Sequence, residues 1–255
     1  MATVTPAAGI RGPSGMWQET EPGLPVVRHP SPNHSKRRGG ARPDMVVLHY
    51  TAMPSSAAAL SRLCDPAHEV SAHYLIDAVG RIYALVPEER RAWHAGAGSW
   101  GGVTDVNSRS IGVELANPGD CPFPAAQMDA LESLLGGVMR RWAVAPERVI
   151  GHSDMAPLRK SDPGPRFDWR RLALGGFSVW PEPAARDAGG AEPDPAAFAA
   201  AAERFGYGAC GEEALLRAFR LRFRPGAHGP LAPADMAAMA QLAARYPVDP
   251  GAAEA

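Results

Sequence analysis

The sequence VIGHSDMAPLRKSDPGP, at residues 149–165, joins a short apolar run to a constrained loop. The apolar run predicts a strand that ends near His152, and the residues after it have neither helical nor strand periodicity. Pro163 and Pro165 fix their own φ angles and push the residues before them toward extended geometry. A His, a Lys and an Asp are therefore held on a rigid loop after a strand, which indicates a functional site.

Histidine and aspartate both bind zinc, but His152 and Asp162 alone do not make a zinc site. A catalytic zinc usually has three protein ligands and one open position, so another part of the chain must supply the third ligand. The cysteines do not form a metal site of their own, because they are far apart, at Cys64, Cys121 and Cys210. We expect them to be buried free thiols.

The composition is that of an ordinary soluble globular protein, with 45% hydrophobic and 21% charged residues. A formal net charge of -1 gives no electrostatic reason to expect nucleic acid or an anionic membrane as a partner. No apolar run approaches the roughly 18 residues of a transmembrane helix. Residues 1–24 lack a basic stretch followed by an apolar one, so we expect a disordered leader rather than a secretory signal. The expected location is cytoplasmic, or periplasmic if the true start of the protein differs.

Hydrophobic periodicity predicts a mixture of strands and helices between residues 25 and 180. Apolar or alternating runs of strand length lie at 45–51, 70–77, 82–86 and 110–115. Helical apolar spacing lies at 55–64 and 124–142. This pattern predicts a sheet with packed helices, in an α/β or α+β fold.

The remainder of the chain is predicted to be a linker and a small helical domain. Residues 181–194 are rich in Pro, Gly and Ala, as linkers commonly are. Residues 195–255 contain three short helical patterns, which predict a three-helix domain that is marginally stable alone.

Other ionisable residues on predicted strands complete the candidate site. His49 ends an apolar strand, where sites in α/β sheets tend to lie, and it supplies a third ligand beside His152 and Asp162. Glu114 lies inside another apolar strand, where a carboxylate costs free energy unless it is paired or used. Lys160 lies two residues before Asp162.

These residue types suit the hydrolysis of an amide. Zinc lowers the pKa of a bound water to roughly 7 and polarises a carbonyl. A carboxylate such as Glu114 can take a proton from that water and deliver it to the leaving nitrogen, while a cation such as Lys160 stabilises the oxyanion. A single histidine at a strand end is more often structural, and the sequence has no HExxH pattern, so spacing alone leaves a structural role open.

Five separated motifs are LHYT at 48–51, SAHYLID at 71–77, AWHAG at 92–96, SIGVELAN at 110–117 and GHSDMAPLRKSDPGP at 151–165. Together they closely resemble the type 2 N-acetylmuramoyl-L-alanine amidases, a zinc family that includes phage lysozyme-like amidases and peptidoglycan recognition proteins. The resemblance implies an α/β fold with a central mixed sheet flanked by helices, over residues 25–180. It also implies one zinc ion and cleavage of the bond between the lactyl group of N-acetylmuramic acid and L-alanine.

The resemblance also implies roles for the candidate residues. The zinc ligands of the family correspond to His49, His152 and Asp162. The catalytic glutamate corresponds to Glu114, and the lysine two residues before the third ligand corresponds to Lys160. The C-terminal helices resemble, more weakly, the small peptidoglycan-binding-like domain that some bacterial members carry.

Several residues in or near the motifs are predicted to contact the substrate: Tyr50, Trp93, His94, Asn107 and Arg109. Loop packing is the alternative for Trp93 and His94, and closing the loop is the alternative for Asn107 and Arg109. For His73, within SAHYLID, a structural or groove-lining role is favoured over metal binding.

We therefore predict a zinc-dependent N-acetylmuramoyl-L-alanine amidase acting on peptidoglycan or soluble muropeptides, including their 1,6-anhydro forms. Cell-wall recycling is preferred over action on the intact wall, and non-catalytic muropeptide binding is a third hypothesis. Binding-only members of the family lose zinc ligands, commonly the third, whereas this sequence has all three. The sequence leaves the oligomeric state open.

Overall fold

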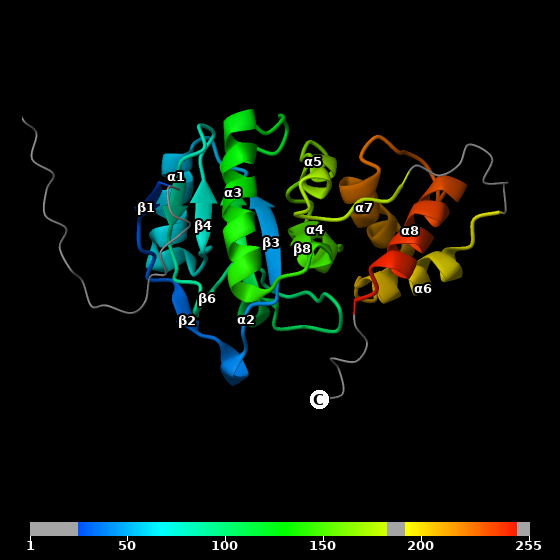
Figure 1. Cartoon of the computed structure of the whole chain (residues 1–255), viewed down its shortest axis with the longest axis horizontal. Helices are drawn as coiled ribbons and strands as arrows, with labels where there is room; N and C mark the ends of the chain where they lie inside the picture. Colours follow the sequence, from blue (N-terminus) through cyan, green and yellow to red (C-terminus); the bar gives the residue numbers. More distant parts are fainter. Residues whose placement is uncertain (1–24, 183–191, 249–255) are drawn as a thin grey trace, which may run out of the picture.

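The computed structural model describes residues 25–182 and 192–248, and Figure 1 shows a central sheet flanked by helices. The predicted leader at 1–24 and most of the predicted linker at 181–194 lie outside the described residues. Within the described part of the chain, no helix combines the length and apolar character needed to cross a membrane.

The main sheet has six strands in the spatial order β1-β5-β4-β7-β3-β8. Their bounds are β1 Val26–Arg28, β3 Met45–Tyr50, β4 Tyr74–Ile76, β5 Ile82–Ala84, β7 Ser110–Leu115 and β8 Val149–Gly151. Strands β4, β7, β3 and β8 run parallel, while β5 pairs antiparallel with β4 and parallel with β1. The sheet is mixed, so the predicted α/β class is confirmed. A separate antiparallel pair consists of β2 (His34–Lys36) and β6 (Arg90–Ala92).

The helices lie between and after these strands. Their bounds are α1 Ser56–Cys64, α2 Val106–Arg109, α3 Ala125–Trp142, α4 His152–Met155, α5 Trp169–Leu174, α6 Pro195–Phe205, α7 Glu212–Phe223 and α8 Pro233–Arg245. Short 3-10 turns lie at Arg38–Gly40, Pro66–His68 and Pro146–Arg148. The three predicted C-terminal helices are present as α6, α7 and α8.

Strand β3 lies inside the sheet and is apolar on both faces. Val46 and Leu48 belong to the buried cluster that includes the apolar residues of α3, whereas Met45 and Val47 belong to the cluster on the other face. Because side chains alternate along a strand, His49 lies on the face opposite α3.

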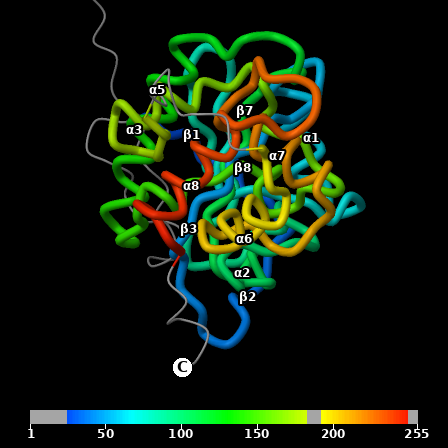
Figure 2. The backbone as a smooth tube through the Cα atoms, turned by 90° about the vertical axis from the view of Figure 1, so that its right-hand side faces the viewer, coloured from blue at the N-terminus to red at the C-terminus, as the bar shows by residue number. Residues whose placement is uncertain are grey.

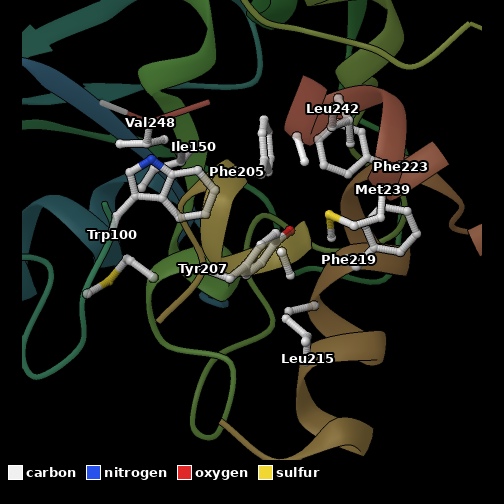
Figure 3. Packing of buried hydrophobic residues seen from close by; sticks show 14 of the residues in the cluster. Trp100, Ile150, Phe205, Tyr207, Leu215, Phe219, Phe223, Met239, Leu242 and Val248 are labelled. Atoms are coloured by element: carbon white, nitrogen blue, oxygen red, sulfur yellow. The ribbon is translucent and has the colours of Figure 1, made fainter. Parts of the chain in front are cut away.

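The C-terminal helices share a hydrophobic core with the sheet. Met45 of β3 and Ile150 of β8 lie in the same buried cluster as Phe205 of α6 and Phe219 of α7. Figure 3 shows Trp100 and Ile150 beside Phe205 in this cluster, and the rings of Trp100 and Phe205 meet edge to face. Figure 2, viewed from this end, shows the helices lying over β3 and β8. The domain boundary near residue 180 stays a prediction. Among the described residues, the segments before and after it share one buried hydrophobic cluster.

Among the described residues, none of the three cysteines belongs to a group of side chains that could hold a metal ion. All are free, as predicted, but Cys64, Cys121 and Cys210 are half-buried rather than buried. Burial raises the pKa of the Cys64 and Cys210 thiols, which disfavours the reactive thiolate.

His73, directly before β4, is fully buried, and its contacts are those of a structural residue, which the sequence favoured. Its Nδ1 accepts the N–H of Gly112 at 2.9 Å, so Nε2 carries the proton and lies 3.1 Å from the carbonyl of Arg90. Burial, followed by the nearby positive charge of Arg37, lowers the pKa of His73 to about 3. The ring is therefore neutral at physiological pH.

The neutral state of His73 predicts acid destabilisation. An unfolded histidine has a pKa of about 6.5, so between that value and about 3 the unfolded chain binds more protons than the folded one. The contribution of neutral His73 to the free energy of unfolding is complete above pH 6.5 and is lost as the pH falls toward 3. The urea midpoint should fall between pH 7 and pH 4, and His73→Gln, although less stable, should show a shallower fall. The exposed His68→Gln is the control, and a wild-type midpoint that stays flat to pH 4 would contradict this account.

Candidate active site

Three metal-ligand side chains converge at the carboxyl end of the parallel strands. His49 lies near the end of β3, His152 begins α4 directly after β8, and Asp162 lies on the following loop. Asp162 Oδ2 lies 2.9 Å from His49 Nδ1 and 3.1 Å from His152 Nδ1. All three residues are buried, and their ligand atoms lie within 4.8 Å of one another. The loop is fixed to α4, because the N–H of Ser153 donates to the Asp162 carbonyl at 2.9 Å.

The surroundings of His152 decide which ring nitrogen carries the proton. Its Nε2 lies 2.8 Å from the carbonyl of Ala95, which can only accept, so Nε2 is the donor. The guanidinium of Arg159 is farther away, at 3.4 Å from Nε2. In the neutral ring, Nδ1 therefore has a free lone pair that points toward Asp162.

A chain of hydrogen bonds fixes the tautomer of His49 in the same way. The Ser110 hydroxyl donates to the Val106 carbonyl at 2.6 Å, so its oxygen accepts from His94 Nε2 at 3.2 Å. His94 Nδ1 then accepts from His49 Nε2 at 3.1 Å. This leaves the Nδ1 lone pair of His49 directed at Asp162. The ring of His94 fits in this series of hydrogen bonds because Gly112 has no side chain. A Cβ at position 112 would lie 2.4 Å from His94 Cγ.

Three lone pairs thus meet at one point, an arrangement that is favourable only around a cation. Burial, then the neighbouring His152, lowers the pKa of His49 to about 4, so the ring offers a lone pair rather than a charge. Asp162 completes the set, because its Oδ2 lies within 3.1 Å of the Nδ1 atoms of both rings. Two imidazole nitrogens and one carboxylate oxygen are the ligand set of a catalytic zinc, and hydrogen bonds to the distal nitrogens are typical of such sites. The residues present fit zinc.

Glu114 faces the same site from β7. It pairs in register with His49 of β3, so the two side chains lie on the same face of neighbouring strands. Its Oε2 is buried and has no hydrogen-bond partner among the described residues. Burial raises the pKa of Glu114 well above its ordinary value, Asp162 adds to the rise, and Lys160 opposes it. A carboxyl with a raised pKa beside a zinc site is suited to proton transfer.

These groups line a pocket of about 450 Å³. The structure brings eight of the ten predicted site residues to its wall: His49, Tyr50, Trp93, His94, Glu114, His152, Lys160 and Asp162. Tyr50 Oη lies 3.1 Å from the Ser161 hydroxyl, and Trp93 Nε1 donates to the Ser35 hydroxyl at 3.4 Å. Loop packing and substrate contact are therefore compatible roles for Trp93.

Asn107 and Arg109 are not brought to the pocket. The Asn107 side-chain oxygen accepts the N–H groups of His94 and Ala95, at 3.0 and 2.9 Å, so Asn107 closes the loop that carries His94. Arg109 precedes β7, five residues and therefore about 16 Å from Glu114 along an extended strand. Its guanidinium pairs with Asp44 at that end of the sheet. Neither residue lines the pocket, and a substrate contact of either one stays a prediction.

The sequence did not single out two arginines of the pocket wall. Arg62 comes from α1, and Arg159 comes from the zinc-site loop, where it donates to the carbonyl of Ala97 at 2.7 Å. The only available signal for Arg159 was its place beside Lys160, and Arg62 carried none, because its helix reaches the pocket only through the tertiary fold.

A parallel sheet edge that presents two histidines, two carboxylates and a lysine in one pocket defines a mononuclear zinc hydrolase site. The family model described as N-acetylmuramoyl-L-alanine amidase matches residues 39–165. The N-acetylmuramoyl-L-alanine amidase AmiD of Escherichia coli (strain K12) is 37% identical over 225 residues, with 77% of this chain and 80% of that protein covered. The chain belongs to the N-acetylmuramoyl-L-alanine amidase family.

The similarity to AmiD covers more of this chain than the similarity to a second relative, AmpD. The 1,6-anhydro-N-acetylmuramyl-L-alanine amidase AmpD of Enterobacter cloacae is 35% identical over 164 residues, covering 57% of this chain and 88% of that protein. A solved complex of E. coli AmiD with the substrate anhydro-N-acetylmuramic acid-L-Ala-D-gamma-Glu-L-Lys superposes with a TM-score of 0.75, at 35% identity, covering 84% of this chain and 94% of that one. That superposition includes C-terminal helices, because residues 1–182 are less than three quarters of the chain.

The convergent lone pairs predict one zinc ion per chain. Hydrogen-bond partners of ligands alone contribute about 10–100-fold to zinc affinity, so Asp162→Ala should weaken binding by more than about 100-fold. Zinc removal by a chelator should also lower the unfolding temperature, because zinc binds the folded state. Isothermal titration calorimetry measures the first effect and thermal unfolding the second. Asp168→Ala, which removes only the cap of α5, is the control. Equal zinc affinity in Asp162→Ala and the wild type would contradict the assignment.

Proposed function

We propose that this protein hydrolyses the amide bond between the lactyl group of N-acetylmuramic acid and L-alanine in muropeptides. The observation that carries the proposal is Glu114, a half-buried carboxyl with a raised pKa that shares a pocket with the complete His49, His152 and Asp162 set. Zinc, when bound there, lowers the pKa of a water and polarises the scissile carbonyl.

Glu114 is the general base and acid of the proposed reaction. Glu114 lines the pocket on the same face of the sheet as His49, so its carboxylate can take the proton of the attacking water. The same carboxyl group then delivers this proton to the nitrogen of the leaving L-alanine. Protonation of that nitrogen completes the cleavage, because a neutral amine leaves far more readily than an amide anion.

Lys160 supports the same step by its charge. It lines the pocket with Glu114, and its positive charge opposes the rise in the pKa of Glu114. In the reaction its ammonium donates to the oxyanion of the tetrahedral intermediate. Lys160 lies on the rigid loop between His152 and Asp162, so the loop fixes its position relative to these two ligands.

Anhydro-muropeptides are the proposed substrates. AmpD is named for the 1,6-anhydro sugar, and the AmiD structure holds an anhydro-muramoyl tripeptide. The stem peptides are anionic, and three cationic side chains line the pocket of this chain: Arg62, Arg159 and Lys160. Degradation of such fragments is part of cell-wall recycling, so the proposal includes a cytoplasmic location.

The carboxylate role is tested with Glu114→Gln. This variant should bind zinc as the wild type does, while kcat falls by about 10²–10⁴-fold, because general acid–base catalysis contributes on that scale. Glu132→Gln, which alters a surface ion pair with Arg171, is the control. Near-normal kcat in Glu114→Gln would remove Glu114 from the reaction.

The substrate proposal is tested by incubating zinc-loaded protein separately with soluble anhydro-muropeptides and with intact sacculi. Mass spectrometry should detect free stem peptides that begin with L-alanine, released faster from the soluble fragments and absent with Glu114→Gln. Release from sacculi alone would make polymeric wall the substrate. Binding of the fragments without release would instead support the binding-only hypothesis.

A further inference from the structure

A buried charge pair connects the C-terminal helices to the segment that presents the zinc ligand His152. Asp154, two residues after His152, is fully buried, and its Oδ2 accepts from Arg222 Nη1 of α7 at 3.0 Å. Its Oδ1 accepts the hydroxyl proton of Tyr207 at 2.7 Å. The same carboxylate caps its own helix, because Oδ2 also accepts the N–H of Gly151 at 2.7 Å.

Arg222 holds the same segment at a second point. Its Nη2 donates to the carbonyl of Val149 at 2.9 Å and to the Ser178 hydroxyl at 3.2 Å. Its guanidinium also lies over the ring of Trp169, 4.6 Å from the centroid. Arg222 is 1% exposed, so these contacts are made away from water and are stronger than surface contacts. One side chain of the C-terminal helices thus binds both ends of the short segment that contains His152.

Apolar contacts reinforce this connection. Met155, which ends α4, lies in the buried cluster that also contains Tyr207 and Phe219. Tyr207 packs edge to face on Trp100, with ring centroids 5.0 Å apart, and Figure 3 shows it between Trp100 and Phe219. Removing these helices would expose the apolar cluster and leave the buried Asp154 without its cation.

We propose that Arg222 and Tyr207 are positioning residues for the zinc ligand His152, acting through Asp154. In this role the C-terminal helices hold the segment that contains His152 in place and are part of the active-site structure. They are then not a separate domain whose only function is to bind the cell wall. The proposal goes beyond the proposed function, because it concerns zinc affinity and requires no substrate.

The test compares two buried arginine–aspartate pairs of the same helix. Arg222→Met breaks the pair with Asp154, whereas Arg220→Met breaks the pair with Asp235, which lies wholly within the C-terminal helices. Arg220 Nε donates to Asp235 Oδ1 at 3.1 Å, and Asp235 keeps Arg224 as a second cation when Arg220 is replaced. Both should lower the unfolding temperature. Only Arg222→Met should weaken zinc binding. We expect about tenfold, the low end of what direct hydrogen-bond partners of metal ligands contribute, because Arg222 contacts Asp154 and Val149 rather than His152 itself.

Zinc affinity is measured by competition with a chromophoric chelator, and the d–d spectrum of the cobalt-substituted protein reports the ligand geometry. Tyr207→Phe keeps the test decisive if Arg222→Met does not fold: it should weaken zinc binding by a few-fold and alter the cobalt spectrum. Arg222→Lys, which retains the charge, should recover part of the loss. Unchanged zinc affinity in Tyr207→Phe and Arg222→Met, or an equal loss in Arg220→Met, would overturn the proposal. Failure of the amidase assay with normal zinc binding would instead count only against the proposed function.

Discussion

The structure depends on the convergence of three lone pairs at the end of the parallel strands. His49 Nδ1, His152 Nδ1 and an oxygen of Asp162 point at one another, because hydrogen bonds to the distal nitrogens fix both rings in the same tautomer. Without a cation this arrangement is repulsive, and with zinc it becomes a ligand set. The stability of the fold is therefore linked to metal binding, since zinc binds only when these segments are correctly placed.

The sheet supplies the geometry that the site requires. Parallel pairing of β3 with β7 places Glu114 opposite His49, and β8 on the other side of β3 brings His152 to the same edge. Gly112 leaves room for the ring of His94 below the site, which allows a hydrogen-bonded chain to reach His49. Each functional group is thus positioned by strand register or by a buried contact. The pocket that these groups line is the space available to the substrate.

The candidate metal ligands and the candidate catalytic glutamate could be predicted from the sequence. The residues that hold them in position could not. A histidine ending an apolar strand and a glutamate inside another were visible as His49 and Glu114, because burial of such groups demands a use. The position of Arg109 before the start of β7 could not be predicted, because sequence proximity to a motif does not reveal which end of a strand a residue occupies. The role of Arg222 could not be predicted, because its partner Asp154 lies 68 positions earlier and only the tertiary fold brings them together.

The most direct test is the anomalous X-ray scattering of a zinc-loaded crystal, recorded on both sides of the zinc absorption edge. The account predicts one strong peak per chain, bonded to Nδ1 of His49, Nδ1 of His152 and the carboxylate of Asp162, with one coordination position open toward Glu114. A peak bonded through the Nε2 atoms, or zinc bound elsewhere with these three side chains unchanged, would contradict it.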